Sequence, residues 1–131
     1  MAQSNKTMMQ LGTAEAAPGA IDTGRLRIGE ARDGAPVGLP VAVINGADTG
    51  RTLYIQAASD GDELNGVGVV RQLVPQLDPA DLSGTILMVG IANLFGYRVG
   101  EHRNPIDDTK LNRAYPGNKK GSTTERIAAA T

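Results

Sequence analysis

The sequence predicts an α/β domain built on a mixed, mostly parallel sheet with flanking helices, and three observations lead to this prediction. Two apolar segments, 52–58 and 84–91, are separated by a helical pattern, and this order is typical of a right-handed parallel crossover. Only one Phe, three Tyr and no Trp are present, so the core must be aliphatic. The 131 residues suffice for one domain with one modest core.

The first half of the chain contains the other strand candidates. Residues 1–20 are polar, Ala-rich and without period, so we expect a flexible N-terminal tail there. Residues 24–31 alternate and suit an edge strand, and residues 40–45 form a further apolar strand. Residues 52–58 are mostly apolar, which predicts burial on both faces.

Helical spacing appears next, at residues 63–74, where apolar side chains recur and Pro75 then follows. Residues 92–121 have no pattern of their own and predict a long polar loop, a kind of segment that is usually functional or disordered. Ser122 and Glu125 have the spacing of a capping box, so the last helix has a defined start.

The number of predicted helices is too small to cover both faces of the predicted sheet, which suggests an incomplete domain. Buried strands need helices on both faces, and the sequence predicts only one complete helix together with a last helix that has no end signal. We therefore expect residues 21–131 to be the N-terminal part of a larger domain, apparently truncated. Exposed strand edges would then favour self-association or a complementing chain.

Composition excludes several classes of function. The net charge of −1 lacks the basic surplus of a nucleic-acid-binding protein, and no long apolar run predicts a membrane span. Cys is absent, which excludes disulfides, thiolate metal sites and a Cys nucleophile. No secretory signal precedes residue 20, so a cytoplasmic location is expected. A metal site made of His alone is also excluded, because His102 is the single histidine.

The acidic turn after the 52–58 strand allows two interpretations. Asp60 and Glu63 have capping-box spacing, with Asp60 as the N-cap of the following helix. The same spacing also suits a D-x-x-E metal pair at the carboxyl end of a strand, where hard oxygen ligands accept zinc or other divalent ions. Asp62 is expected to point away as a solvated charge near the helix N-terminus.

A second polar cluster lies in the long loop. Arg103, Asn112 and Arg113 suit a substrate carboxylate and a polarised carbonyl oxygen. The alternative is ordinary surface charge among turn residues, which composition alone favours. His102 precedes Arg103 in an extended stretch, so its side chain should point to the opposite side. We expect His102 at the surface, with a role as ligand or base as the alternative.

Together these segments resemble the N-terminal half of the succinylglutamate desuccinylase/aspartoacylase family, within the zinc carboxypeptidase superfamily. Four motifs carry the resemblance, in the family's order. They are D-G-D-E-L-N-G at 60–66, L-S-G-T at 82–85, the N-x-x-G-to-R stretch from Asn93 to Arg103, and D-x-x-x-L-N-R-x-Y-P-G at 107–117 followed by G-S-T-T-E-R-I-A at 121–128.

The resemblance implies a role for five residues. Glu63 matches the family's zinc-binding Glu, and Asp60 stands where the family has its first zinc-binding His. Arg103 matches the arginine that polarises the scissile carbonyl, and Asn112 and Arg113 match the pair that holds the substrate carboxylate. The resemblance thus implies a zinc enzyme, although Asp at position 60 lets manganese or another divalent ion compete better.

The implied activity is a metal-dependent amidohydrolase acting on an N-acyl amino acid or a related amide. In the family, the second zinc-binding His and the general-base Glu follow on later strands, and neither matches a residue of this chain. We therefore expect the chain alone to be inactive. The alternatives are a non-catalytic fragment or split half with a binding or assembly role, and a carboxypeptidase-like peptidase.

Overall fold

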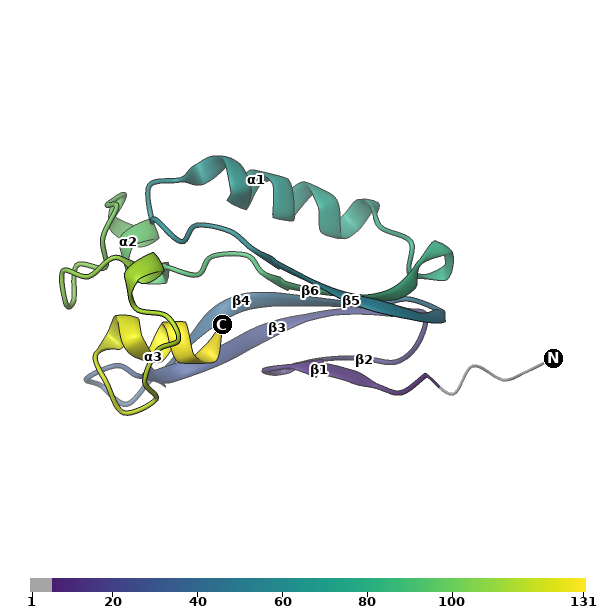
Figure 1. Ribbon diagram of the computed structural model, residues 1–131, viewed down its shortest axis with the longest axis horizontal. Coiled ribbons are helices and arrows are strands. Elements are labelled where there is room, and N and C mark those ends of the chain that lie inside the picture. The colour runs from purple at the N-terminus through teal and green to yellow at the C-terminus, as the bar shows by residue number, and fades with distance from the viewer. Residues whose placement is uncertain (1–5) are drawn as a thin grey trace.

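The computed structural model describes residues 6–131, and its centre is a four-stranded sheet in the order β3-β4-β6-β5 (Figure 1). A separate two-stranded hairpin, β1-β2, precedes it in the chain. The strands are β1 Met9–Leu11, β2 Ala14–Ala16, β3 Ala20–Glu30, β4 Pro36–Asn45, β5 Asp48–Gln56 and β6 Ser83–Val89. The helices are α1 Leu64–Leu73, α2 Leu94–Val99 and α3 Thr123–Ala130, with short 3-10 turns at Val74–Gln76, Pro79–Asp81 and Leu111–Arg113.

The predicted mixed sheet with flanking helices is confirmed, and so is the crossover from β5 through α1 to the parallel strand β6. The parallel share is smaller than expected, because β3 pairs antiparallel with β4 and β4 pairs antiparallel with β6. β4 therefore lies in the middle of the sheet. Its last five residues, 41–45, are all buried.

Each face of the sheet packs against its own apolar layer. α1 covers one face with Val67 and Val70, which belong to the same buried cluster as Ile44 and Met88. The opposite face packs against the β1-β2 hairpin and α3 (Figure 1), through a second cluster that includes Ala14, Leu39, Val43, Leu111 and Ile127. The small residues of the hairpin allow it to lie close to the sheet.

The expected flexible tail at 1–20 is wrong for residues 6–20, and residues 1–5 lie outside the described part of the chain. Ala14 and Ala16 are 0% and 2% exposed. Buried Asn45 donates from its amide to the carbonyls of Thr7 and Ala16, at 3.0 and 2.9 Å. These long-range contacts order a segment whose own sequence carries no periodic pattern.

Two other expectations are corrected. β5 was expected to be buried on both faces, yet it is an edge strand on which Leu53 is 53% exposed. The segment 92–121, predicted to be a loop, contains the helix α2. Asn93 is its N-cap, because the Asn93 side chain accepts a hydrogen bond from the Gly96 amide. Gly100 is its C-cap and has the left-handed conformation. The last helix begins at Ser122 with both hydrogen bonds of the capping box, as predicted.

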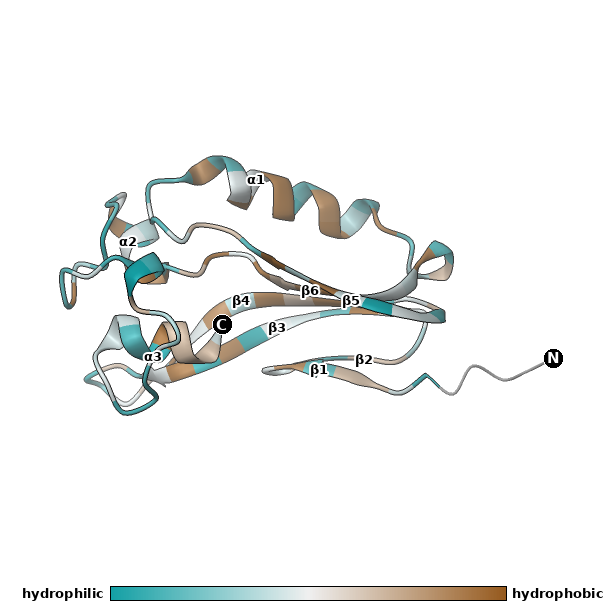
Figure 2. Cartoon of the chain, viewed as in Figure 1, coloured by the Kyte–Doolittle hydropathy of each residue, from teal (hydrophilic) through white to brown (hydrophobic). Residues whose placement is uncertain are grey.

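Within residues 6–131, no helix has the length and apolar character needed to cross a bilayer. Figure 2 shows that apolar residues concentrate on the sheet and on α1. The loops that follow β5 and β6 are mostly hydrophilic. The candidate site lies among these loops.

Candidate functional site

The candidate site lies beyond the carboxyl ends of the parallel neighbours β5 and β6. Their backbones stay paired after the strands end, since the amides of Ala92 and Asn93 donate to the carbonyls of Ala57 and Ala58 at 2.9 and 2.8 Å. Ala58 takes a positive φ of 52°, which turns the chain into the acidic segment. Parallel pairing therefore brings the two loops to the same edge, where open α/β sheets bind ligands.

Gly61 holds the acidic turn against α2. A Cβ atom at this position would lie 2.2 Å from the Gly96 carbonyl carbon and 2.3 Å from the Tyr97 nitrogen. The backbone of His102 adds a second link, because its carbonyl accepts from the Gly61 amide at 3.4 Å and from the Asn93 side-chain amide at 3.3 Å. The turn is thus positioned by main-chain contacts that only glycine permits.

The capping-box interpretation of Asp60 is wrong. The N-cap of α1 is Glu63, which makes no side-chain capping hydrogen bond, and Asp60 contributes only a backbone carbonyl to the Glu63 amide at 3.1 Å. The Asp60 side chain is 15% exposed, and its Oδ1 atom is buried without a hydrogen-bond partner. Glu63 is exposed, beside a cavity of about 540 Å³ that Asp62 also lines.

His102 is closer to the acidic turn than its sequence context indicated. Its Nδ1 lies 3.4 Å from Asp60 Oδ2 and 3.3 Å from Asp62 Oδ1. Asp62 therefore shares a partner with Asp60, although we expected it to point away as a solvated charge. The histidine itself remains 41% exposed, so its ring is both a surface group and a contact of the turn.

A signal for this contact was present in the sequence. The segments that follow two parallel neighbouring strands must meet at one edge, and His102 lies in the segment after β6. Arg103 does not join this contact, because its side chain is paired with Asp108. Its Nη1 donates to the Asp108 carbonyl at 2.9 Å and lies 3.7 Å from the Asp108 carboxylate.

The loop that carries Arg103 is anchored by hydrogen bonds that involve the buried residues Asn104 and Thr124. Asn104, 1% exposed, donates to the Thr124 hydroxyl at 3.0 Å. The hydroxyl and the amide of Thr124 in turn donate to the Asp107 carboxylate at 2.6 and 2.7 Å. These bonds fix the loop to the first turn of α3.

Asp107 is held in its charged form. Burial alone raises the pKa of this carboxyl, but the hydrogen bonds donated by Thr124, with those from Ser122 and Thr109, outweigh burial and hold the pKa below its ordinary value. The carboxylate also lies at the N-terminus of α3, where the helix dipole favours negative charge.

Asn112 and Arg113 lie in the short 3-10 turn Leu111–Arg113, and both side chains are exposed. Leu111 anchors this turn, because it is 1% exposed and belongs to the core under the hairpin. The site residues therefore fall into two groups on neighbouring loops, with Asp60 and Glu63 after β5 and Arg103, Asn112 and Arg113 after β6 and α2.

A hydrogen-bonded cluster connects the segments that carry the two groups. The Gln56 amide, at the end of β5, donates to Ser59 Oγ and to the Tyr115 hydroxyl, both at 2.9 Å. The Tyr54 hydroxyl donates to the side-chain oxygen Oε1 of Gln56 at 2.8 Å. Burial and the neighbouring Tyr115 raise the pKa of Tyr54 to about 12, so Tyr54 stays a neutral donor at physiological pH.

Comparisons with known proteins identify the family. Residues 49–131 match the model of the succinylglutamate desuccinylase/aspartoacylase catalytic domain. The chain belongs to this family. It is also 32% identical over 90 residues to the N-alpha-acetyl-L-2,4-diaminobutyric acid deacetylase of Halomonas elongata, a match that covers 69% of the chain and 26% of the relative.

Solved structures extend the likeness to the fold. An aspartoacylase family protein from Mesorhizobium loti superposes with a TM-score of 0.78 at 32% identity, over 96% of this chain and 39% of that one. The product-bound ectoine utilization protein EutE (DoeB) from Ruegeria pomeroyi gives 0.76 at 29% identity, over 83% and 34%. The chain thus spans between a quarter and two fifths of these relatives.

Proposed function

We propose that this family member is a metal-dependent amidohydrolase that removes the acyl group from an N-acyl amino acid. The membership supports acyl amino acid hydrolysis as the class of reaction. The observation that carries the metal part of the proposal is the Asp60 carboxylate, whose buried Oδ1 has no hydrogen-bond partner beside the exposed Glu63. A buried carboxylate oxygen without a donor is costly unless a cation completes it.

The residues present fit a divalent ion in part. Asp60 and Glu63 offer hard oxygen ligands, and His102 Nδ1 lies near enough to Asp60 to join or to orient it. Within residues 6–131, no three such side chains are arranged as a ready metal site, so the pair would form part of a larger ligand set. A bound zinc or manganese ion would lower the pKa of a water ligand and polarise the substrate carbonyl.

The remaining residues would bind and orient the substrate. Arg103 uses one nitrogen for Asp108, which leaves further N–H donors for the developing oxyanion of the acyl carbonyl. Arg113 and Asn112 would hold the carboxylate of the amino acid, because a guanidinium pairs with a carboxylate through two parallel hydrogen bonds. The anchored loop would keep these donors at fixed positions relative to the acidic turn.

The first test of this function is metal binding by the purified protein. Calorimetric titration with Zn²⁺ and Mn²⁺ should show one site that Asp60→Ala and Glu63→Ala each weaken by tenfold or more, whereas Asp78→Ala, at a distant 3-10 turn, should not. The Halomonas relative makes N-acetyl-2,4-diaminobutyrate the first substrate to assay, beside N-acetylaspartate and N-succinylglutamate.

The role of the arginines is tested separately. Arg103→Ala should lower kcat more than it raises KM, whereas Arg113→Ala should mainly raise KM. Metal binding that survives both carboxylate changes would refute the metal site. Because the chain alone is expected to be inactive, turnover and the arginine variants are measured in the enzyme completed by the family's second His and general base. Metal binding without turnover in that completed enzyme would favour the non-catalytic alternative.

A further inference from the structure

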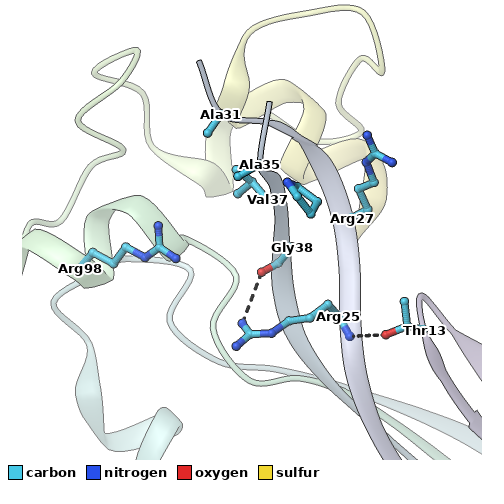
Figure 3. Close-up of a pocket in the computed structure, with 9 residues that line it drawn as sticks. Thr13, Arg25, Arg27, Ala31, Ala35, Val37, Gly38 and Arg98 are labelled. Carbon is cyan, nitrogen blue, oxygen red and sulfur yellow. Dashed lines mark hydrogen bonds between the residues drawn. The ribbon is translucent and has the colours of Figure 1, made fainter. Parts of the chain in front are cut away.

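A cavity of about 750 Å³ lies where the β3-β4 hairpin faces α2 (Figure 3). Three of its lining residues are arginines, Arg25 and Arg27 from β3 and Arg98 from α2. None of the residues that line the cavity is acidic. Ala31, Val37 and their neighbours give it an apolar wall. Positive charge is thus concentrated in one hollow of a chain whose net charge is −1.

Two of the three guanidinium groups keep most of their hydrogen-bonding capacity. Arg25 Nη1 donates only to the Gly38 carbonyl, at 3.5 Å, which is the outer limit of a hydrogen bond. Within residues 6–131, the Arg98 side chain makes neither a hydrogen bond nor an ion pair. In Figure 3, both side chains extend into the space between α2 and the hairpin.

Arg27 differs from the other two. It forms an ion pair with Glu30, and Figure 3 shows its guanidinium directed away from Arg98. Its charge is therefore already compensated by a neighbour on the same strand. The uncompensated pair is Arg25 and Arg98.

Two uncompensated like charges in one cavity raise its electrostatic potential and attract an anion. A guanidinium presents N–H donors in a planar fork that matches a carboxylate or a phosphate group. The apolar wall would favour a ligand that also carries a short hydrocarbon part. Oxyanion and hydrocarbon would then lie against opposite sides of the same hollow.

We propose that this cavity binds a small oxyanion with a short apolar part, held between Arg25 and Arg98, with the apolar part against Val37 and Ala31. The site shares no residue with Asp60, Glu63, Arg103, Asn112 or Arg113. It is therefore a second binding site, distinct from the proposed hydrolytic one. A carboxylate and a phosphate ester share the required chemistry.

The test is a titration of the purified protein, without added metal, with butyrate, inorganic phosphate and the neutral analogue butyramide. The arginine Nε–Hε signals in ¹H–¹⁵N NMR spectra report the contact directly. We expect butyrate or phosphate to shift the signals of Arg25 and Arg98 and not that of Arg71, which is exposed on α1. Butyramide should shift neither.

Variants then measure the contribution of each arginine. Arg25→Gln and Arg98→Gln should each weaken anion binding by about tenfold, because each removes a charge-assisted contact. Arg71→Gln is the matched control and should leave binding unchanged. Arg98→Lys keeps the positive charge but loses the planar pair of N–H donors, so it should weaken anion binding by an intermediate amount. This variant replaces Arg98→Gln in the test if the Gln variant does not fold.

The outcomes separate the ligand classes. Tighter binding of butyrate than of phosphate identifies a carboxylate site with an apolar wall, and the reverse order identifies a phosphate site. Equal losses in Arg71→Gln, or shifts spread over all arginines, would show non-specific charge attraction and overturn the proposal. Unchanged signals at Arg25 and Arg98 with both anions would overturn it as well.

Discussion

Two neighbouring loops at the same edge of the sheet are held in place by opposite means. The loop from Asn104 to Asp107 is fixed by side chains, through the buried hydrogen bonds that connect Asn104, Thr124 and Asp107. The acidic turn around Gly61 is fixed by its backbone, which packs on α2 and donates to the His102 carbonyl. In the turn, the side chains of Asp60 and Glu63 make no capping bond.

The difference shows how a small fold can separate support from chemistry. Where side chains hold the structure, their polar atoms are already satisfied and are not available for a ligand. Where the backbone holds it, carboxylate oxygens can stay without a structural role, as does the buried Oδ1 atom of Asp60, which has no hydrogen-bond partner. Such a group reduces stability and is consistent with a functional role.

The largest expected effect comes from breaking the backbone contact. Gly61→Ala would place a Cβ atom 2.2 to 2.5 Å from three main-chain atoms of the segment 96–101, so we expect the unfolding free energy to fall by about 3 kcal/mol or more. Gly68→Ala is the matched control, because nothing lies within 4 Å of its added methyl group. In α1 this control should stabilise the protein by about 0.5–1 kcal/mol. Chemical denaturation measures both, and equal effects would refute the backbone account.

The next effect comes from the buried side-chain network. Thr124→Val removes a hydroxyl that donates to Asp107 and accepts from Asn104, leaving both groups short of a partner. We expect a loss of about 2–3 kcal/mol in denaturant unfolding. Thr123→Val, one residue earlier in α3, breaks only a 3.4 Å contact with Arg126 and should change stability by less than about 0.5 kcal/mol.

The pH dependence of stability should come partly from Asp107. Because its folded pKa is depressed, its contribution is fully present above the unfolded pKa of about 3.9 and is lost as pH falls through the folded pKa. Asp107→Asn should therefore lower stability by about 1 kcal/mol at pH 7 and have less effect at pH 3. Asp108→Asn is the control, since its carboxyl is 87% exposed. A pH-independent cost of Asp107→Asn would contradict the assignment.

The smallest effect on stability is expected where the proposed chemistry is concentrated. Asp60→Asn keeps the shape of the side chain and removes a charge whose Oδ1 atom has no partner and whose Oδ2 atom makes only a 3.4 Å contact with His102. The unfolding free energy without metal should therefore fall by less than about 0.5 kcal/mol. Metal affinity should fall at least tenfold in the same variant. A stability loss above about 2 kcal/mol would mean that Asp60 is structural.

The elements that the sequence predicted well are those with a local cause. The spacing of Val67 and Val70 specified the apolar face of α1, and the Ser122–Glu125 capping box specified the start of α3. The crossover from β5 to β6 then followed from the rule of handedness and from segment order. The same logic placed Asp60 and Glu63 after a strand, beside the start of a helix.

The elements that the sequence did not predict depend on distant partners. Short strands at Met9–Leu11 and Ala14–Ala16 are ordered by contacts with residues about 30 positions away, such as Asn45. β5 looked buried because apolar content indicates burial, but position in the sheet decides how many faces are covered. α2 had recognisable limits in Asn93 and Gly100, and the contact of His102 with the turn needed the topology first.

The close approach of Gly61 to α2 has a consequence for how the site can be altered. Because main-chain atoms determine the shape of the turn, the side chains at positions 60, 62 and 63 can be exchanged without rebuilding the fold. The side chain at each of these positions could therefore be replaced by Asp, His or Glu while the backbone of the turn stays the same. If the proposed metal site is confirmed, its metal preference would be changed by varying the residue at position 60 and leaving Gly61 and Gly96 untouched.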